Sequence, residues 1–161
     1  VFLPKIGSVT AATSAPLSDG AAAMVVMSEA TARRHQLTPL VRVVGTAVVG
    51  VSPALMGMGP VHATHKVLHR SGLRLQDIEI VELNEAFAVQ AIACIEELKL
   101  DHERVNVCGG SLAIGHPLGA SGARISTTLI HAMRDRQIRL GLAAMCVGLG
   151  QGVAVIFELI D

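Results

Sequence analysis

Residues 78–98 read IEIVELNEAFAVQAIACIEEL, and the pattern of apolar side chains changes in the middle of this stretch. Residues 78–83 alternate at first and are rich in Ile and Val, which predicts a strand. Phe87 to Leu98 is apolar nearly all round until Glu96, which predicts a buried helix. A strand followed directly by a buried helix indicates an α/β sheet.

The same alternation continues in both directions along the chain. The predicted strands lie at 21–28, 41–50, 78–83, 105–107, 140–147 and 152–159. The predicted helices are 29–35 with Ser28 as a cap, one from Pro60 to a stop at Gly72, 87–98, and one carrying Ile125, Leu129, Ala132 and Met133. This order predicts a mainly parallel sheet covered by helices and closed by an antiparallel pair joined through a tight GLGQ connection. We expect one domain over 21–161, preceded by a lead-in segment at 1–20.

Composition excludes several classes of function. The 13 basic and 13 acidic residues cancel, so there is no charge signature of a nucleic-acid partner. Aromatic residues make up only 2% of the chain, too few for a base-stacking platform. No apolar run reaches the length of about 18 residues that a membrane span needs. The three cysteines lack metal-type spacing, which favours free thiols in a reducing compartment.

Three short stretches carry candidate chemistry, and each follows a predicted strand, where open α/β sheets place their sites. His116 lies in GGSLAIGHPLGASGAR (109–124), where glycines allow close backbone approach and Pro117 fixes the chain. It is either a proton carrier or a histidine of a turn. Cys146 is either a buried apolar thiol or a thiol facing an oxyanion-binding glycine turn. Asn84 is either a helix N-cap or a ligand of a water or an oxyanion.

Other motifs have simpler interpretations. His62, His65 and His69 share one helix face, which we interpret as a solvated face and not a metal site, because no carboxylate or thiol ligand accompanies them. Cys94 and Cys108 are expected to be buried thiols. The glycine-rich stretch lacks the G-K-[ST] of a P-loop and the register of a dinucleotide fingerprint.

Four blocks of the sequence together resemble the thiolase family. They are NEAFA (84–88), NVCGGSLAIGHPLGASGAR (106–124), CVGLGQG (146–152) and GSVTAATSAPLSDGAAA (7–23). In their individual residues, these blocks are most similar to the bacterial fatty-acid β-oxidation type, the 3-ketoacyl-CoA thiolase subunit. The resemblance covers essentially the whole chain. It implies the C-terminal half of a thiolase fold: a five-stranded mixed sheet with helices on both faces and an antiparallel last strand.

The resemblance also implies roles for particular residues. His116 matches the histidine that deprotonates a nucleophilic cysteine and helps hold the thioester oxygen. Cys146 matches the acid/base cysteine, Asn84 the asparagine that holds a water in the first oxyanion hole, and Gly148 the glycine whose N–H serves the second. The implied CoA-binding positions are Ser14, Ala15, Leu17, Ala86 and Phe87. The serine that contacts pantetheine in the family falls at Ala15, and Ser14 stands one place before it.

The function implied is that of an acetyl-CoA acyltransferase, with CoA and acyl-CoA as substrates and with no further cofactor and no metal. None of the three cysteines matches the family's nucleophile, which belongs to the N-terminal half, so this chain alone is expected to be inactive. The alternatives are a biosynthetic acetoacetyl-CoA thiolase and a stand-alone, non-catalytic CoA-binding domain. The expected partners are the N-terminal thiolase half, further copies in a homodimer or tetramer, and a β-oxidation multienzyme subunit. We expect no nucleic-acid partner, no membrane span and a bacterial cytoplasmic location.

Overall fold

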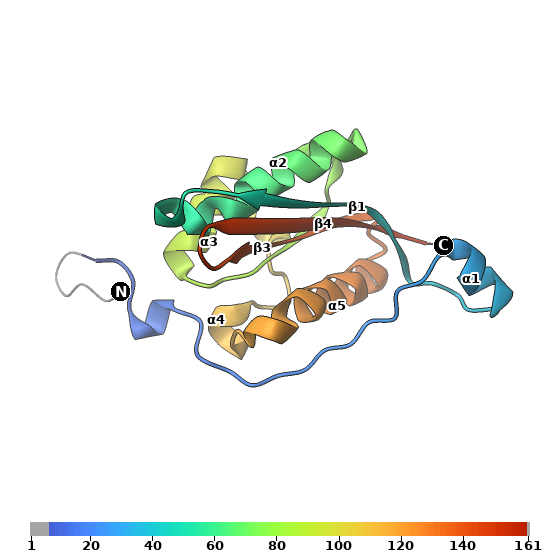
Figure 1. Cartoon of the computed structure of the whole chain (residues 1–161), viewed down its shortest axis with the longest axis horizontal. Helices are drawn as coiled ribbons and strands as arrows, with labels where there is room; N and C mark the ends of the chain where they lie inside the picture. Colours follow the sequence, from blue (N-terminus) through green and yellow to red (C-terminus); the bar gives the residue numbers. More distant parts are fainter. Residues whose placement is uncertain (1–6, 161) are drawn as a thin grey trace.

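The computed structural model describes residues 7–160, so the first six residues of the predicted lead-in segment lie outside the described part. Its centre is a four-stranded sheet in the order β1-β4-β3-β2 (Figure 1). The strands are β1 (Val41–Gly50), β2 (Ile80–Leu83), β3 (Leu140–Val147) and β4 (Gln151–Leu159). β4 pairs antiparallel with both β1 and β3, whereas β2 and β3 are parallel. The α/β class and the antiparallel last strand are confirmed. The expectation of a mainly parallel sheet is wrong, because β4 pairs antiparallel with both of its neighbours and β2–β3 is the one parallel pair in the described sheet.

Helices cover both faces of this sheet, as predicted. The helices are α1 (Glu29–Arg34), α2 (Gly59–Ser71), α3 (Ala88–Leu98), α4 (Ser111–Ile114) and α5 (Leu118–Arg136), with short 3-10 turns at Ala11–Thr13, Pro53–Met58, Leu75–Asp77 and His102–Arg104. α2 and α3 form one apolar core with the sheet, and α5 forms a second core on the opposite face (Figure 1). The sheet therefore lies between two helical layers.

The helix boundaries follow the predicted signals. The Ser28 hydroxyl accepts a hydrogen bond from the Thr31 N–H at the start of α1. Pro60 occupies the first turn of α2, where its missing N–H costs nothing. Gly72 ends α2 at φ +67°, in the left-handed region that glycine enters without strain.

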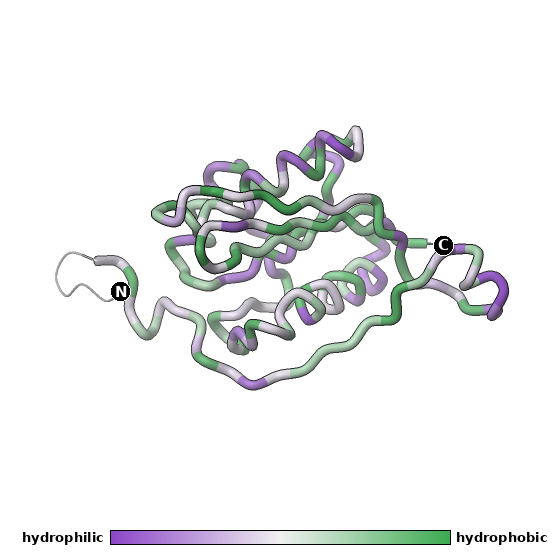
Figure 2. Tube along the Cα trace, in the orientation of Figure 1, coloured by the Kyte–Doolittle hydropathy of each residue, from purple (hydrophilic) through white to green (hydrophobic). Residues whose placement is uncertain are grey.

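The sheet has four strands among the described residues, so the prediction of five is wrong. Residues 21–28 are one cause, because they run extended without pairing to any described strand. This segment instead runs along the outside of α5 (Figure 1), and Met24 and Met27 line a hollow there with Thr127 and Ile130. Its apolar side chains remain in contact with solvent, as the green stretch before α1 in Figure 2 illustrates.

Residues 105–107 also form no strand, and the reason lies at Asn106. Val105 makes a single parallel bridge with Val81, and Asn106 then turns into the left-handed region at φ +50°. Its side-chain amide takes over the pairing that a strand would provide: the Leu83 N–H donates to Oδ1 (2.8 Å), and Nδ2 donates to the Leu83 carbonyl (2.9 Å). One side chain therefore replaces a strand at this edge of the sheet.

Candidate functional site

The NEAF stretch and Cys146 lie at the carboxyl ends of the parallel strands β2 and β3. Asn84 follows β2 directly, and its backbone N–H donates to the Ala144 carbonyl of β3 (2.9 Å). Cys146 lies two residues beyond Ala144 on the same strand. The N-cap interpretation of Asn84 is wrong, since α3 begins at Ala88 with Phe87 as its N-cap. Asn84 is instead 1% exposed and directed into the protein.

His116 is brought directly to Asn84. The His116 Nε2 atom lies 3.3 Å from the Asn84 Nδ2 atom, and the other ring nitrogen, Nδ1, lies 2.6 Å from the Ser121 hydroxyl. Ser121 is fully buried in the first turn of α5, where its hydroxyl donates to the Pro117 carbonyl (3.0 Å). Both nitrogens of the imidazole are therefore held, and the ring is fixed in orientation.

Sequence reasoning missed Ser121 and also missed Ser111 and Arg124, which complete this arrangement. The buried Ser111 hydroxyl donates to Asn84 Oδ1 (2.7 Å) and accepts from Arg124 Nη2 (2.8 Å). The second guanidinium nitrogen of Arg124 donates to the Gly115 carbonyl (2.6 Å), next to the histidine. A signal was available, because Arg124 is the only residue among 109–124 with a permanent charge.

The environment shifts the pKa of both candidate acid–base groups. Burial, and secondly the positive charge of Arg124, lower the pKa of His116, which favours the neutral imidazole. Burial, with a smaller contribution from nearby Cys94, raises the pKa of the Cys146 thiol to about 11. At neutral pH the resting pair is therefore a neutral base and a protonated thiol.

Glu85 fastens the glycine-rich stretch to this end of the sheet. Its carboxylate accepts from Asn106 Nδ2 (2.9 Å) and from the Leu112 N–H (3.0 Å) at the start of α4. A Cβ atom on Gly110 would lie 2.3 Å from this carboxylate, so the close approach requires glycine. Glu85 therefore acts as a hydrogen-bonding link between the loop after β2 and the glycine-rich stretch.

Glu82 is a second carboxyl behind the site. It is 3% exposed on β2, and its Oε1 atom has no hydrogen-bond partner within the described chain. Burial raises the pKa of Glu82 to about 7, with the charge of Arg124 opposing and that of Glu85 reinforcing the rise. The carboxyl thus changes charge near neutral pH, two residues before Asn84.

The residues implied as CoA contacts are brought to the same end of the sheet. Ser14 forms an antiparallel bridge with Phe87, and the Ala15 N–H donates to the Ala86 carbonyl (3.1 Å). One residue after Ala15, the Pro16 carbonyl accepts a hydrogen bond from the His116 backbone N–H (3.4 Å). The lead-in segment therefore lies between the NEAF stretch and the histidine loop. The Leu17 side chain is 100% exposed.

Gly148 and Cys108 lie in exposed turns. Gly148 is in the turn between β3 and β4, and the space around its Cα is open. Cys108 is exposed, so the expectation of a buried thiol is wrong there, whereas Cys94 is fully buried as expected. The reason is the turn that begins at Asn106 and continues through Gly109 at φ +84°, which carries Cys108 outward.

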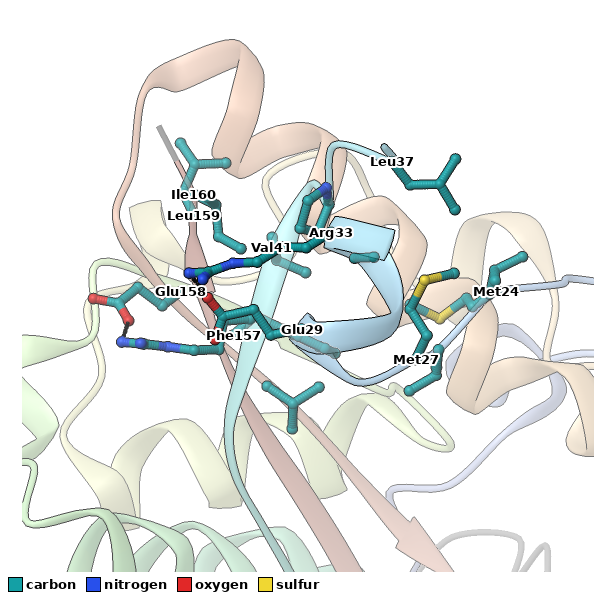
Figure 3. Close-up of a pocket in the computed structure, with 16 residues that line it drawn as sticks. Met24, Met27, Glu29, Arg33, Leu37, Val41, Phe157, Glu158, Leu159 and Ile160 are labelled. Atoms are coloured by element: carbon teal, nitrogen blue, oxygen red, sulfur yellow. Dashed lines mark hydrogen bonds and ion pairs between the residues drawn. The ribbon is translucent and has the colours of Figure 1, made fainter. Parts of the chain in front are cut away.

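A further hollow lies elsewhere, at the opposite end of the sheet. It has a volume of about 680 Å³ and lies between residues 24–27, α1 and the ends of β1 and β4. Figure 3 shows Met24, Met27 and Leu37 around α1, with Phe157, Glu158 and Leu159 on the β4 side. Because β4 is antiparallel to β3, these residues are at the far end of the sheet from Cys146. The hollow is therefore separate from the candidate site.

The remaining sequence motifs contribute no chemistry to the site. His62, His65 and His69 are all exposed on α2, which confirms a solvated helix face. Within residues 7–160, no three His, Cys, Asp or Glu side chains are grouped so that they could hold a metal ion. None of the helices described has the length and apolar character needed to cross a membrane.

The fold and the site define an α/β domain that holds a partly buried, neutral imidazole against a buried amide at the carboxyl ends of its strands. A protonated thiol lies on the adjacent strand. The family model described as "Thiolase, C-terminal domain" matches residues 37–159. This chain belongs to the thiolase C-terminal domain family.

Individual relatives agree with this assignment. The chain is 57% identical to a 3-ketoacyl-CoA thiolase of Aeromonas salmonicida and 55% identical to one of Vibrio cholerae. Each alignment covers 98% of this chain and 42% of the relative, so the chain spans about two-fifths of the length of these relatives.

Solved structures show the same fold. The Bacillus anthracis acetyl-CoA acetyltransferase superposes with a TM-score of 0.94 at 47% identity, over 96% of this chain and 39% of that one. Human mitochondrial 3-ketoacyl-CoA thiolase in complex with CoA superposes with a TM-score of 0.92 at 40% identity, over 99% of this chain and 41% of that one.

Proposed function

We propose that the protein carrying this chain is an acetyl-CoA acyltransferase that cleaves 3-ketoacyl-CoA with CoA, giving acetyl-CoA and a shortened acyl-CoA. The observation that carries the proposal is the partly buried contact between His116 and the buried Asn84, which directly follows β2, the strand next to the one that carries the Cys146 thiol. The names of the curated relatives support the same reaction. We place this reaction in fatty-acid β-oxidation, in an oligomeric bacterial enzyme of the cytoplasm.

In the first half-reaction, His116 acts as a base. Its Nε2 atom takes the proton of a cysteine thiol supplied by the rest of the protein, and the thiolate attacks the 3-keto carbon of the substrate. The Nε2–H formed in this way then faces a carbonyl oxygen that gains negative charge. The lowered pKa of His116 suits this role, because the imidazole is neutral before the reaction begins.

Cys146 is the proton donor in our proposal. When the bond between carbons 2 and 3 breaks, the shortened acyl group stays on the nucleophilic cysteine and the electron pair stays on acetyl-CoA as an enolate. The Cys146 S–H protonates that carbon, and its thiolate then takes the proton of an incoming CoA thiol, which accepts the acyl group. A pKa of about 11 keeps Cys146 protonated until this step. We assign stabilisation of the enolate oxygen to the Gly148 N–H, in the turn after β3.

The substrate's pantetheine arm is assigned to the lead-in segment. Ser14 and Ala15 pair with the Ala86–Phe87 backbone, and the Pro16 carbonyl, which precedes the exposed Leu17, accepts a hydrogen bond from the His116 backbone N–H. A chain bound there would end at the imidazole. The solved relative with CoA bound supports CoA as the ligand of this fold.

A second candidate is the biosynthetic reaction, in which two acetyl-CoA molecules give acetoacetyl-CoA and CoA. The observation that favours it is the TM-score of 0.94 with a protein named acetyl-CoA acetyltransferase. The groups described above serve both directions, because an acid–base thiol that protonates a carbon also removes a proton from it.

The test is Cys146→Ala in the protein carrying this chain, with 3-ketoacyl-CoA substrates of several lengths. Thiolysis of 3-ketoacyl-CoA should fall by about 10² or more, because the enolate has lost its proton donor. Acylation of the nucleophilic cysteine by a simple acyl-CoA, whose CoA thiolate can leave without a proton, should be retained and visible by intact mass. The matched control is Cys108→Ala, which removes an exposed thiol and should leave the rate unchanged.

Loss of acylation in Cys146→Ala would contradict the acid–base role. The 161-residue chain on its own should show no thiolysis, and turnover by it would contradict an external nucleophile. Binding of CoA without turnover in the longer protein would favour a non-catalytic CoA-binding domain.

A further inference from the structure

The hydrogen bonds around His116 form one chain whose direction is set at both ends. From α5 the chain runs through Arg124, Ser111, Asn84, His116 and Ser121 to the Pro117 carbonyl. A guanidinium can only donate hydrogen bonds, and a carbonyl oxygen can only accept them. The members between these two ends must therefore all donate in the same direction.

At the first end, Arg124 decides the orientation of the Asn84 amide. Ser111 accepts from Arg124 Nη2, so its own proton is free to be donated to Asn84. The amide must then present Oδ1 to Ser111 and Nδ2 to the histidine. In the reversed orientation, Ser111 would accept from both neighbours, and its buried hydroxyl proton would lose this acceptor.

At the second end, the Pro117 carbonyl decides the tautomer of the ring. Ser121 donates its proton to this carbonyl, so its oxygen accepts from His116 Nδ1–H. The remaining nitrogen, Nε2, then carries a lone pair and accepts from the Asn84 Nδ2–H group at 3.3 Å. Both ends of the chain independently give the same protonation state of the ring.

We propose that Arg124 and Ser111 are positioning residues that fix the Asn84 amide and thereby hold His116 as a neutral imidazole with its lone pair on Nε2. The inference rests on the proposed function, since it explains how the base is kept ready. Once Nε2 takes the proton of a thiol, the Nε2–H and the Asn84 Nδ2–H are both donors, so the hydrogen bond between them is lost. The new Nε2–H is then directed to a substrate oxygen.

The charged groups around the ring stay the same in the variants that test this proposal. Arg124 comes from α5, Glu82 from β2 and Glu85 from the loop after β2, and the Cys146 thiol lies on β3. Ser111→Ala removes the donor to Asn84 Oδ1 together with the acceptor of Arg124 Nη2, and Arg124 keeps its charge and its bond to the Gly115 carbonyl. The amide is then free to turn Oδ1 toward Nε2, which stabilises the imidazolium.

The first measurement is ¹⁵N NMR of the histidine rings in the protein carrying this chain, without substrate. We expect His116 to show a protonated Nδ1 and an unprotonated Nε2 above its titration. In Ser111→Ala its titration should move to higher pH. Ser121→Ala, which alters the other end, should lower the population of the Nδ1–H tautomer. The control is Ser126→Ala on α5, whose hydroxyl donates to Gly122 instead; it should change neither property.

The second measurement is the pH profile of kcat/KM. Its acid limb should move to higher pH in Ser111→Ala, with a loss of about tenfold on the acid side for each pH unit moved, while Ser126→Ala keeps the parent profile. An Nε2–H tautomer in the resting protein, or a titration unchanged by Ser111→Ala, would overturn the proposal. If the protein catalyses thiolysis but its resting His116 is the Nε2–H tautomer, this inference is wrong and the proposed function stands. The expected tautomer without thiolysis defeats the proposed function and leaves the hydrogen-bond assignment in place.

Discussion

The two ends of the sheet depart from ordinary globular packing in opposite ways. At the carboxyl ends of β2 and β3, polar side chains are buried: Asn84, Ser111 and Ser121 are at most 1% exposed. At the other end, apolar side chains of the segment before α1 are exposed, with Val25 at 86% and Val26 at 78% (Figure 2). The usual distribution is the reverse in both places.

The difference shows what each end is built for. Buried polar groups are costly unless they are paired, and those around His116 are paired in one continuous chain. The hydrogen bonds offset the cost of burying these groups, and they also hold the amide and the imidazole in fixed orientations. Exposed apolar groups gain nothing from water, so the 24–27 segment is suited to contact with another surface. We therefore predict that chemistry and association occupy different ends of one domain.

The strongest test of the polar end is Glu82→Gln. Glu82 is buried behind the site, and its Oε1 atom has no hydrogen-bond partner among the described residues. Its folded-state pKa of about 7 lies above the ordinary value of 4.5. The stability linked to this group is therefore fully present below pH 4.5 and is lost as pH rises through about 7. The interval between these values corresponds to about 3 kcal/mol, at about 1.4 kcal/mol per pH unit.

The measurement is chemical denaturation of the parent and of Glu82→Gln between pH 4.5 and 8. Relative to the parent, the variant should gain about 3 kcal/mol of unfolding free energy across this range, since glutamine does not ionise. The control is Glu97→Gln at an exposed position of α3, which should give a parallel curve. A pH dependence shared by parent and Glu82→Gln would mean that Glu82 stays charged or is solvated.

Asn106→Ala tests whether one side chain really replaces a strand at this end. The variant loses bonds to the Leu83 N–H, the Leu83 carbonyl and Glu85, and leaves partly buried partners unpaired. We expect a loss of about 2 kcal/mol of unfolding free energy. Hydrogen exchange should become faster at the Leu83 and Leu112 amides and remain unchanged in the β1–β4 ladder. Unchanged exchange at Leu83 would contradict the replacement.

The comparison also explains which parts of the structure were predictable from sequence. The regular elements followed local signals: Ser28, Pro60 and Gly72 mark helix ends where predicted, and β3 and β4 form the expected hairpin. The errors came from long-range pairing. A strand needs a neighbour, and neither residues 21–28 nor residues 105–107 have a described ladder to join, although the first stretch is apolar and the second carries two valines.

The chemical groups of the site were predictable from the sequence, but the hydrogen bonds that connect them were not. His116, Asn84 and Cys146 were candidates because imidazole, amide and thiol groups follow strands. The roles of Ser111 and Ser121 depend on side-chain contacts across 27 and 5 residues, which no periodicity encodes. Asn84 was also misplaced as a cap, because β2 passes to α3 through a loop that ends only at Phe87.

The smallest effect on stability is expected at the apolar end, and it separates folding from association. The double change Val25→Ser and Val26→Ser removes two exposed apolar side chains, so the unfolding free energy of the 161-residue chain should change by less than about 0.5 kcal/mol. The parent chain should self-associate with rising concentration in light scattering, and the double variant should do so less. Leu149→Ser, at an equally exposed position in the β3–β4 turn, is the control and should associate like the parent. If the parent chain stays monomeric, or if the double change does not alter its association, exposure at residues 24–27 does not mark a contact surface. The contrast between the two ends would then rest on the polar end alone.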